Sequence, residues 1–214
     1  MQLLIDQETR EDYQDLLTDM FGLRKRIFCD RLGWPLAVKN GLEIDEFDTD
    51  AARYQLIIDQ KGRLAGSQRL LPTRQNGRDD TSLLFTKFRH VITEPVGPSE
   101  DMWEASRGCV HEAVSGPAKH WVMGAIAVGQ LEAALLAPAP VNWIACLVNV
   151  SQFSLFAQIG WDMEVIGEPT ADGIMALRIR VSHTALDLAR RTTGIGDWIS
   201  RYPDPATPAK PIAA

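Results

Sequence analysis

Apolar residues recur along the chain at two spacings, which predict alternating helices and strands. Steps of three and four residues predict helices over 10–32, 119–137, 151–159 and 183–191, and a short helix or turn over 83–92. Apolar runs and alternating positions predict strands over 52–59, 64–71, 102–110, 141–150, 164–169 and 174–181. A turn at residues 60–63 joins the first two strands into a hairpin. Since helices alternate with strands and one pair is antiparallel, we expect an α/β fold, a three-layer α-β-α sandwich with a mixed sheet.

Breaks in the pattern mark where elements end. Pro138 and Pro140 end the helix over 119–137, and Gly160 closes the helix over 151–159. The stretch from Glu43 to Asp50 is too acidic for a core position.

The length of 214 residues predicts one large domain, residues 1–201, followed by a flexible Pro/Ala-rich tail, residues 202–214. Residues 1–10 carry charges unlike those of a signal peptide, and no apolar run reaches the roughly 20 residues of a membrane span. The three cysteines, Cys29, Cys109 and Cys146, fit reduced thiols of a cytoplasmic protein.

Composition also excludes several partners. The net charge of −6 argues against nucleic acid as the main partner, because phosphate binding needs a basic surface. Neither the cysteines nor the four histidines have metal-ligand spacing, so we expect no metal site. Phosphate-binding glycine loops and the common hydrolase motifs are missing from the sequence as well.

A first group of residues with chemical potential is Arg24, Phe28 and Trp34. Arg24 and Phe28 are four residues apart, so they share one helix face. A guanidinium beside two aromatic rings can hold a carboxylate or stack on a flat or cationic ligand. The alternative is an amphipathic helix with its arginine reaching solvent.

The second group is acidic: Glu43, Asp45, Glu46, Asp48 and Asp50. Three interpretations remain open, which are a solvated loop, a metal site, and a loop that binds a cationic or amine-bearing ligand. A calcium loop is excluded because its glycine and terminal glutamate are missing at the required offsets.

The third group is the segment Trp103–Arg107 within a predicted strand. Alternation places Glu104 and Ser106 on one side and Arg107 on the other. Charges within a strand need partners, and Arg69 in the strand over 64–71 is one candidate. A carboxylate in a partly dry cleft is a candidate general base, whereas a structural ion pair is the alternative.

These groups, taken in order, resemble the acyl-homoserine-lactone synthases, the LuxI-type autoinducer synthases. The resemblance covers residues 10–165 and rests on five features: Arg24 with Phe28 and Trp34, Asp45 with Asp48, Gly66–Thr73 including Arg69, Phe88, and Trp103–Arg107. Each motif is weak alone, but the ordered set is specific.

The resemblance implies a fold similar to the GNAT N-acyltransferases. It also implies that an acyl thioester acylates the amine of S-adenosylmethionine, which then lactonises and releases 5′-methylthioadenosine. S-adenosylmethionine and the acyl thioester are both substrates, so the resemblance implies no cofactor. The expected catalytic residues are Glu104 as base, Ser106 and Arg107. The residues expected to bind S-adenosylmethionine are Arg24, Phe28, Trp34, Asp45, Asp48 and Arg69, and the sequence leaves open which carboxylate pairs with which arginine.

An apolar acyl pocket is expected from Phe88, Trp143, Cys146, Val148 and Phe153. The helix over 151–159 lacks the basic residues that family members use to dock acidic acyl-carrier protein. Either the carrier protein docks elsewhere, with Arg24, Lys25, Arg26 and Arg31 as one patch, or acyl-CoA is the donor. We expect a monomer or weak oligomer.

Two other functions compete with the synthase. One is a GNAT-type acyltransferase acting on another amine, but Arg107–Val110 does not continue into that family's pyrophosphate loop. The other is a non-catalytic domain of the same fold, which would not need Glu104 together with three strand and helix arginines.

Overall fold

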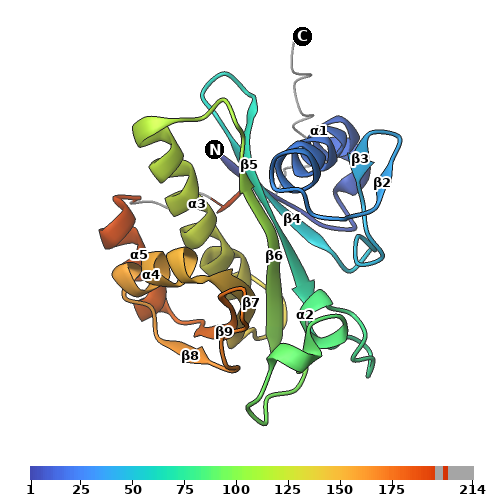
Figure 1. Cartoon of the computed structure of the whole chain (residues 1–214). Coiled ribbons are helices and arrows are strands. Elements are labelled where there is room, and N and C mark those ends of the chain that lie inside the picture. The colour runs from blue at the N-terminus through green and yellow to red at the C-terminus, as the bar shows by residue number, and fades with distance from the viewer. Residues whose placement is uncertain (196–199, 202–214) are drawn as a thin grey trace. The chain divides into compact units, whose positions relative to one another are not determined.

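The computed structural model describes residues 1–195 and the backbone of residues 200–201, so the predicted tail over 202–214 lies outside the described residues. The chain forms two compact units (Figure 1). The first contains residues 1–69, 107–129 and 200–201, and the second contains residues 70–106 and 130–195. The chain passes from one unit to the other within β5, β6 and α3.

The first unit contains the N-terminal helices and five complete strands. Its elements are β1 (Gln2–Ile5), η1 (Arg10–Tyr13), α1 (Gln14–Arg24), η2 (Lys25–Arg31), β2 (Val38–Lys39), β3 (Leu42–Glu43), β4 (Arg53–Ile58), β10 (Ser200–Arg201), and parts of β5 (Leu64–Pro72), β6 (Met102–Val110) and α3 (Gly116–Leu135). β1 pairs antiparallel with β4 and parallel with β10.

The second unit completes β5, β6 and α3. Its own elements are α2 (Leu83–Thr86), η3 (Arg89–Val91), β7 (Trp143–Asn149), α4 (Val150–Ile159), β8 (Met163–Val165), β9 (Ile174–Arg180) and α5 (His183–Thr193). β6 and β7 run parallel, whereas β9 is antiparallel to both β7 and β8. Helices α4 and α5 lie side by side (Figure 1). Parallel and antiparallel pairs together confirm the predicted α/β class with a mixed sheet.

Local sequence explains where the helices of the second unit begin and end. Asn149 caps α4, because its side chain accepts the Gln152 N–H at 2.9 Å and Gln152 accepts the Asn149 N–H at 3.0 Å. Gly160 ends α4 in the left-handed conformation, with φ of 81°, as predicted. Ser182 caps α5 in the same way by accepting the Ala185 N–H.

Two predictions for the N-terminal region are wrong in detail. The helix expected over 10–32 is divided into a 3₁₀ turn, an α-helix and a seven-residue π-helix. A seven-residue segment is too short for the spacing of its apolar residues to distinguish a 3₁₀, an α- and a π-helix. Strand β1 was not predicted, because a segment of four residues, three of them apolar, is too short to show a period, yet all four are buried.

A close backbone contact in the second unit depends on Gly167. A Cβ atom there would lie 1.8 Å from the Val91 carbonyl oxygen, where Thr93 also donates to the Ile166 carbonyl at 3.1 Å. We expect Gly167→Ala to destabilise the fold by about 1–3 kcal/mol, because backbone must move to admit the methyl group. Thermal unfolding measures this, with Gly97→Ala as the matched control because its Cβ would meet nothing within 4 Å. Equal stability of the two variants would contradict the prediction.

Candidate functional site

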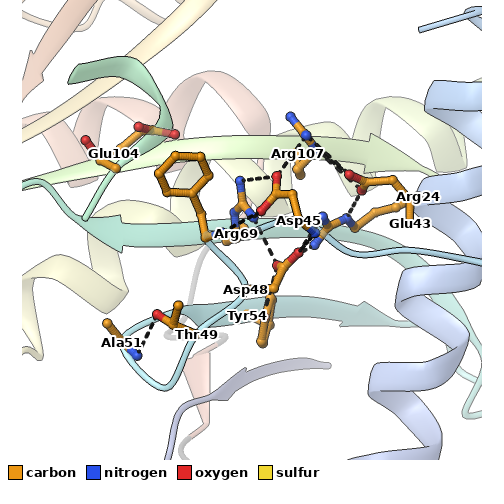
Figure 2. Close-up of polar contacts among 12 residues, drawn as sticks. Arg24, Glu43, Asp45, Asp48, Thr49, Ala51, Tyr54, Arg69, Glu104 and Arg107 are labelled. Atoms are coloured by element: carbon orange, nitrogen blue, oxygen red, sulfur yellow. Dashed lines mark hydrogen bonds and ion pairs between the residues drawn. The ribbon is translucent and has the colours of Figure 1, made fainter. Parts of the chain in front are cut away.

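Three arginines and three carboxylates meet within the first unit (Figure 2). They come from separate elements: Arg24 ends α1, Glu43 ends β3, Asp45 and Asp48 follow β3, Arg69 lies in β5, and Arg107 lies in β6. In the close-up their charged ends point toward one another. Positive and negative charges are equal in number, so the group as a whole is neutral.

Arg24 holds two of the carboxylates. Its Nη1 and Nη2 donate to the two carboxylate oxygens of Asp48 at 2.8 and 2.9 Å, which is bidentate geometry. Its Nε donates to Glu43 Oε2 at 2.5 Å. The π-helix that follows α1 starts directly after this residue.

The other two arginines complete the pattern. Arg69 Nη1 donates to Asp48 at 3.0 Å and to Asp45 at 2.5 Å. Arg107 Nη2 donates to Asp45 at 2.9 Å and to Glu43 at 3.2 Å. Every carboxylate therefore bridges two arginines, and the six residues form a closed circuit of alternating charge. We call Arg24, Asp48, Arg69, Asp45, Arg107 and Glu43, in that order, the ion-pair ring.

Burial and mutual charge determine the protonation of the ring. Burial alone raises the pKa of Asp48, but hydrogen bonds and charge from Arg24 and Arg69 outweigh it and hold the pKa well below its usual value. Burial acts to lower the pKa of Arg24, and Asp48 and Glu43 reverse this and raise it. Asp48 and Arg24 are therefore both ionised at neutral pH, and each of these two charges depends on its neighbours.

Exposure divides the ring into an inner and an outer side. Asp48 is fully buried and accepts five hydrogen bonds, from Arg24 twice, from Arg69, from the Tyr54 hydroxyl and from the Asp45 N–H. A carboxylate has about four lone-pair sites, so Asp48 has no capacity left for a ligand. Asp45 and Arg107 keep 14% and 7% of their side chains exposed. A ligand can reach the ring through these two residues.

Aromatic side chains lie beside the outer side. Phe28, in the π-helix, stacks on Trp34 with ring centroids 5.0 Å apart and planes 17° apart. The Arg107 guanidinium lies over the Phe28 ring at 5.8 Å. Trp34 is 45% exposed and leaves a face available. This surface suits a ligand with a cationic centre that also has an amine and a carboxylate.

The sequence identified five of the six ring members. The stretch from Glu43 to Asp50 was predicted to lie outside the core, but Glu43 is fully buried and so is the Asp48 side chain, so for these two residues the prediction is wrong. Two arginines neutralise each of these carboxylates, and composition of the local segment cannot show this. Arg24 is also fully buried and cannot belong to an exposed basic patch with Lys25 and Arg26. Tyr54 was missed because a tyrosine in an apolar strand carries no functional signal.

Glu104 lies in the second unit, on β6. Its side chain is buried, and Oε2 accepts the Leu84 N–H at 2.6 Å, at the second residue of α2. Ser106 follows on the same strand, and Arg107 after it has φ of 54°, a left-handed backbone that is uncommon outside glycine. Regular strand geometry is therefore interrupted next to Ser106, within β6.

The five predicted acyl-pocket residues do not form one cluster. Phe88 and Trp143 pack against a buried group that includes Ala145 and Ala176. Cys146 and Val148 occupy the alternate positions of β7, so they face the opposite side of that strand. Phe153 is half-buried on α4.

Thiol reactivity offers a direct check of this part of the structure. Burial raises the pKa of Cys109 to about 11 and that of Cys146 to about 12, so both remain inert thiols. Cys29 is partly exposed. We therefore expect a thiol reagent at pH 8 to modify one cysteine in the folded protein and all three after denaturation. Cys29→Ser should remove the reaction of the folded protein, and rapid labelling of that variant would refute the assignment.

Within residues 1–195, no three His, Cys, Asp or Glu side chains are grouped so that they could hold a metal ion. No helix in the described part of the chain is long and apolar enough to cross a membrane.

Comparison with known proteins gives a consistent result. The profile of the autoinducer synthase family matches residues 7–188. The acyl-homoserine-lactone synthase of Rhizobium etli is 31% identical over 146 residues, covering 67% of this chain and 66% of that protein. The enzyme of the same name from Agrobacterium fabrum is 28% identical over 186 residues, covering 80% of each chain.

Solved structures agree in fold. The CoA-dependent acyl-homoserine lactone synthase MesI superposes with a TM-score of 0.78 at 26% identity, covering 94% of this chain and 98% of that one. An acyl-CoA N-acyltransferase from Pseudomonas aeruginosa superposes at 0.50 with 16% identity over 83% of this chain and 97% of that one, which relates the fold alone to the N-acyltransferases. The match across most of the chain shows that it belongs to the autoinducer synthase family, the acyl-homoserine-lactone synthases.

Proposed function

We propose that the chain makes an N-acyl-L-homoserine lactone from S-adenosylmethionine and an acyl thioester. The α-amine attacks the thioester carbonyl, so that a C–N bond forms and the C–S bond breaks with release of the thiol. A carboxylate oxygen of the methionyl group then attacks its own γ-carbon. This second step forms the lactone C–O bond, breaks the bond to the sulfonium and releases 5′-methylthioadenosine. The family match over residues 7–188 is the observation that carries the proposal.

The outer side of the ion-pair ring fits the methionyl end of S-adenosylmethionine. Asp45 can accept from its amine, and Arg107 can donate to its carboxylate. The sulfonium is a cation, which an aromatic face such as Trp34 over Phe28 attracts. Arg24, Asp48 and Arg69 then hold Asp45 and Arg107 in place, because their own charges are already satisfied within the ring.

Glu104 is the proposed general base. An α-amine is largely protonated near neutral pH, since its reference pKa is about 7.7–8.0, and it attacks only after losing a proton. Glu104 accepts that proton directly or through a water. The carbonyl oxygen becomes negative in the tetrahedral intermediate, and backbone N–H groups next to Ser106, where regular strand geometry is interrupted, are the proposed donors.

The acyl group is proposed to lie where strands β6 and β7 stop pairing. Their parallel pairing covers three positions and ends at Glu104 opposite Ala145. Cys146 and Val148 follow on β7 beyond this point. A chain lying at the edge of β7 contacts residues from both of its faces, which accommodates the division of the predicted pocket.

Acyl-CoA is the proposed donor. Helix α4 carries no lysine or arginine to attract an acidic carrier protein, and the whole chain has a net charge of −6. MesI, which is 26% identical over nearly its whole length, is described as CoA-dependent. A small-molecule thioester does not need a basic protein-docking surface.

The test is mass spectrometry of the products formed by the purified protein with S-adenosylmethionine and a panel of acyl-CoA and acyl-carrier-protein thioesters. An acyl-homoserine lactone together with 5′-methylthioadenosine supports the synthase. Equal or faster reaction with carrier protein at low salt overturns the choice of CoA. Acylation of another amine without formation of a lactone would favour the plain N-acyltransferase. If the protein does not bind S-adenosylmethionine at all, a non-catalytic domain would be favoured.

A further inference from the structure

Tyr54 touches the ion-pair ring from the buried side (Figure 2). It is the second residue of β4 and is 1% exposed. Its hydroxyl donates to Asp48 Oδ1 at 3.0 Å, and the same oxygen accepts from Arg24 at 2.8 Å and from Arg69 at 3.0 Å. The hydroxyl is thus an uncharged donor at the point where two guanidiniums meet.

The ring of Tyr54 is itself held in place. Phe21 of α1 meets it edge-on with centroids 5.7 Å apart. The Arg10 guanidinium lies over the Tyr54 ring, 5.4 Å from its centroid. Burial first, and then the negative charge of Asp48, raise the pKa of Tyr54 well above its usual value. The hydroxyl therefore stays protonated and remains a donor at neutral pH.

Arg10 fixes the loop that carries Asp48. Its Nη2 donates to the Thr49 carbonyl at 2.9 Å and to the Ala52 carbonyl at 3.1 Å. Arg10 thereby ties down the chain between Asp48 and β4. Tyr54 contacts the Asp48 carboxylate directly, and Arg10 holds the backbone that follows it.

The position of Asp48 is coupled to that of Asp45. The Asp45 N–H donates to Asp48 Oδ2 at 2.9 Å, and Arg69 binds both carboxylates. If the Tyr54 hydroxyl is removed, Oδ1 loses its uncharged donor and Asp48 is drawn toward the arginines. Asp45 moves with Asp48. A change at Tyr54, which is buried, thereby reaches Asp45, which is the partly exposed carboxylate.

We infer that Tyr54 is a positioning residue of the S-adenosylmethionine site, acting through Asp48 on Asp45. This inference rests on the proposed function. It goes further because it assigns a role to a residue that carries no charge and does not reach the surface.

The experiment compares Tyr54→Phe with the wild-type protein in steady-state kinetics and in calorimetric binding of S-adenosylmethionine. A hydrogen bond to a charged group is worth about tenfold in an equilibrium constant, so we expect the KM and Kd for S-adenosylmethionine to rise about 5–20-fold. The kcat and the KM for the acyl thioester should change by less than about twofold, since neither the base nor the acyl pocket is touched.

Thr49→Ala is the matched control. Thr49 lies in the same loop, and its hydroxyl accepts the Ala51 N–H at 3.3 Å, away from Asp48 (Figure 2). This variant should bind S-adenosylmethionine like the wild type.

Arg10→Lys is the second variant. It keeps the positive charge but loses the pair of hydrogen bonds to the Thr49 and Ala52 carbonyls. It should raise the Kd for S-adenosylmethionine in the same direction as Tyr54→Phe.

The outcomes separate the inference from the function beneath it. If the wild-type protein fails to bind S-adenosylmethionine, the proposed function fails. If the wild type binds it and Tyr54→Phe binds equally well, the positioning role fails alone. A fall in kcat together with a rise in both KM values would show a general structural effect and would also overturn the inference, as would an equal shift in Thr49→Ala.

Discussion

Glu104→Gln is expected to lower the rate of acyl transfer by about 10²–10⁴-fold, the usual contribution of a general base. Glutamine has nearly the same shape and still offers an oxygen to the Leu84 N–H, but it cannot take a proton from the amine. Single-turnover formation of the amide measures the step directly. Because Glu104 acts on the reaction and not on binding, calorimetry should give an unchanged Kd for S-adenosylmethionine.

Glu100→Gln is the matched control for this prediction. Glu100 belongs to the same unit and is exposed, so the same chemical change there should leave the rate at the wild-type value. Full acylation activity of Glu104→Gln would remove Glu104 from the role of base.

Asp48→Ala is expected to give the largest loss of stability in the first unit. The substitution leaves Arg24 and Arg69 buried with one carboxylate fewer between them. Removing one partner of a buried charge group costs about 3–5 kcal/mol, because the remaining charge is left without compensation. Thermal unfolding should show a fall in Tm of about 6–20 °C for a chain of this size.

The control for Asp48→Ala is two residues further along the same loop. Asp50 pairs with Arg10 at 3.4 Å, but its side chain is 75% exposed. An exposed pair is screened by water, so Asp50→Ala should cost about 1 kcal/mol or less. Similar losses from the two substitutions would show that the ion-pair ring does not stabilise the fold.

The ring also predicts the response to acid. The pKa of Asp48 is lower in the folded protein than in the unfolded chain, where it is about 3.9. As pH falls below about 4, Asp48 becomes protonated in the unfolded chain but stays ionised in the folded protein. Stability from this group is therefore present above that pH and is lost as pH falls further. Asp48→Asn should unfold with a shallower dependence on pH below 4 than the wild type.

Local features of the chain were readable because they depend on neighbours in sequence. Gly160 ends α4 since a left-handed residue is needed there, and the strand over 102–110 was predicted at its observed limits. The ordered motifs, from Arg24 to Arg107, were enough to indicate the family. The π-helix over Lys25–Arg31 escaped prediction because three- and four-residue apolar spacing is compatible with more than one winding.

The sequence by itself determined the α/β class, most of the elements, the family and five members of the ion-pair ring. Tertiary structure alone decided how the charges pair, that Glu43 completes the ring and that Tyr54 supports Asp48. The reason is the separation along the chain: Arg24 and Glu43 are 19 residues apart, and Arg107 and Glu43 are 64 apart. A carboxylate is stable in the interior only when it is paired with donors or cations, and here these come from other elements. The local sequence pattern does not show which elements will be in contact.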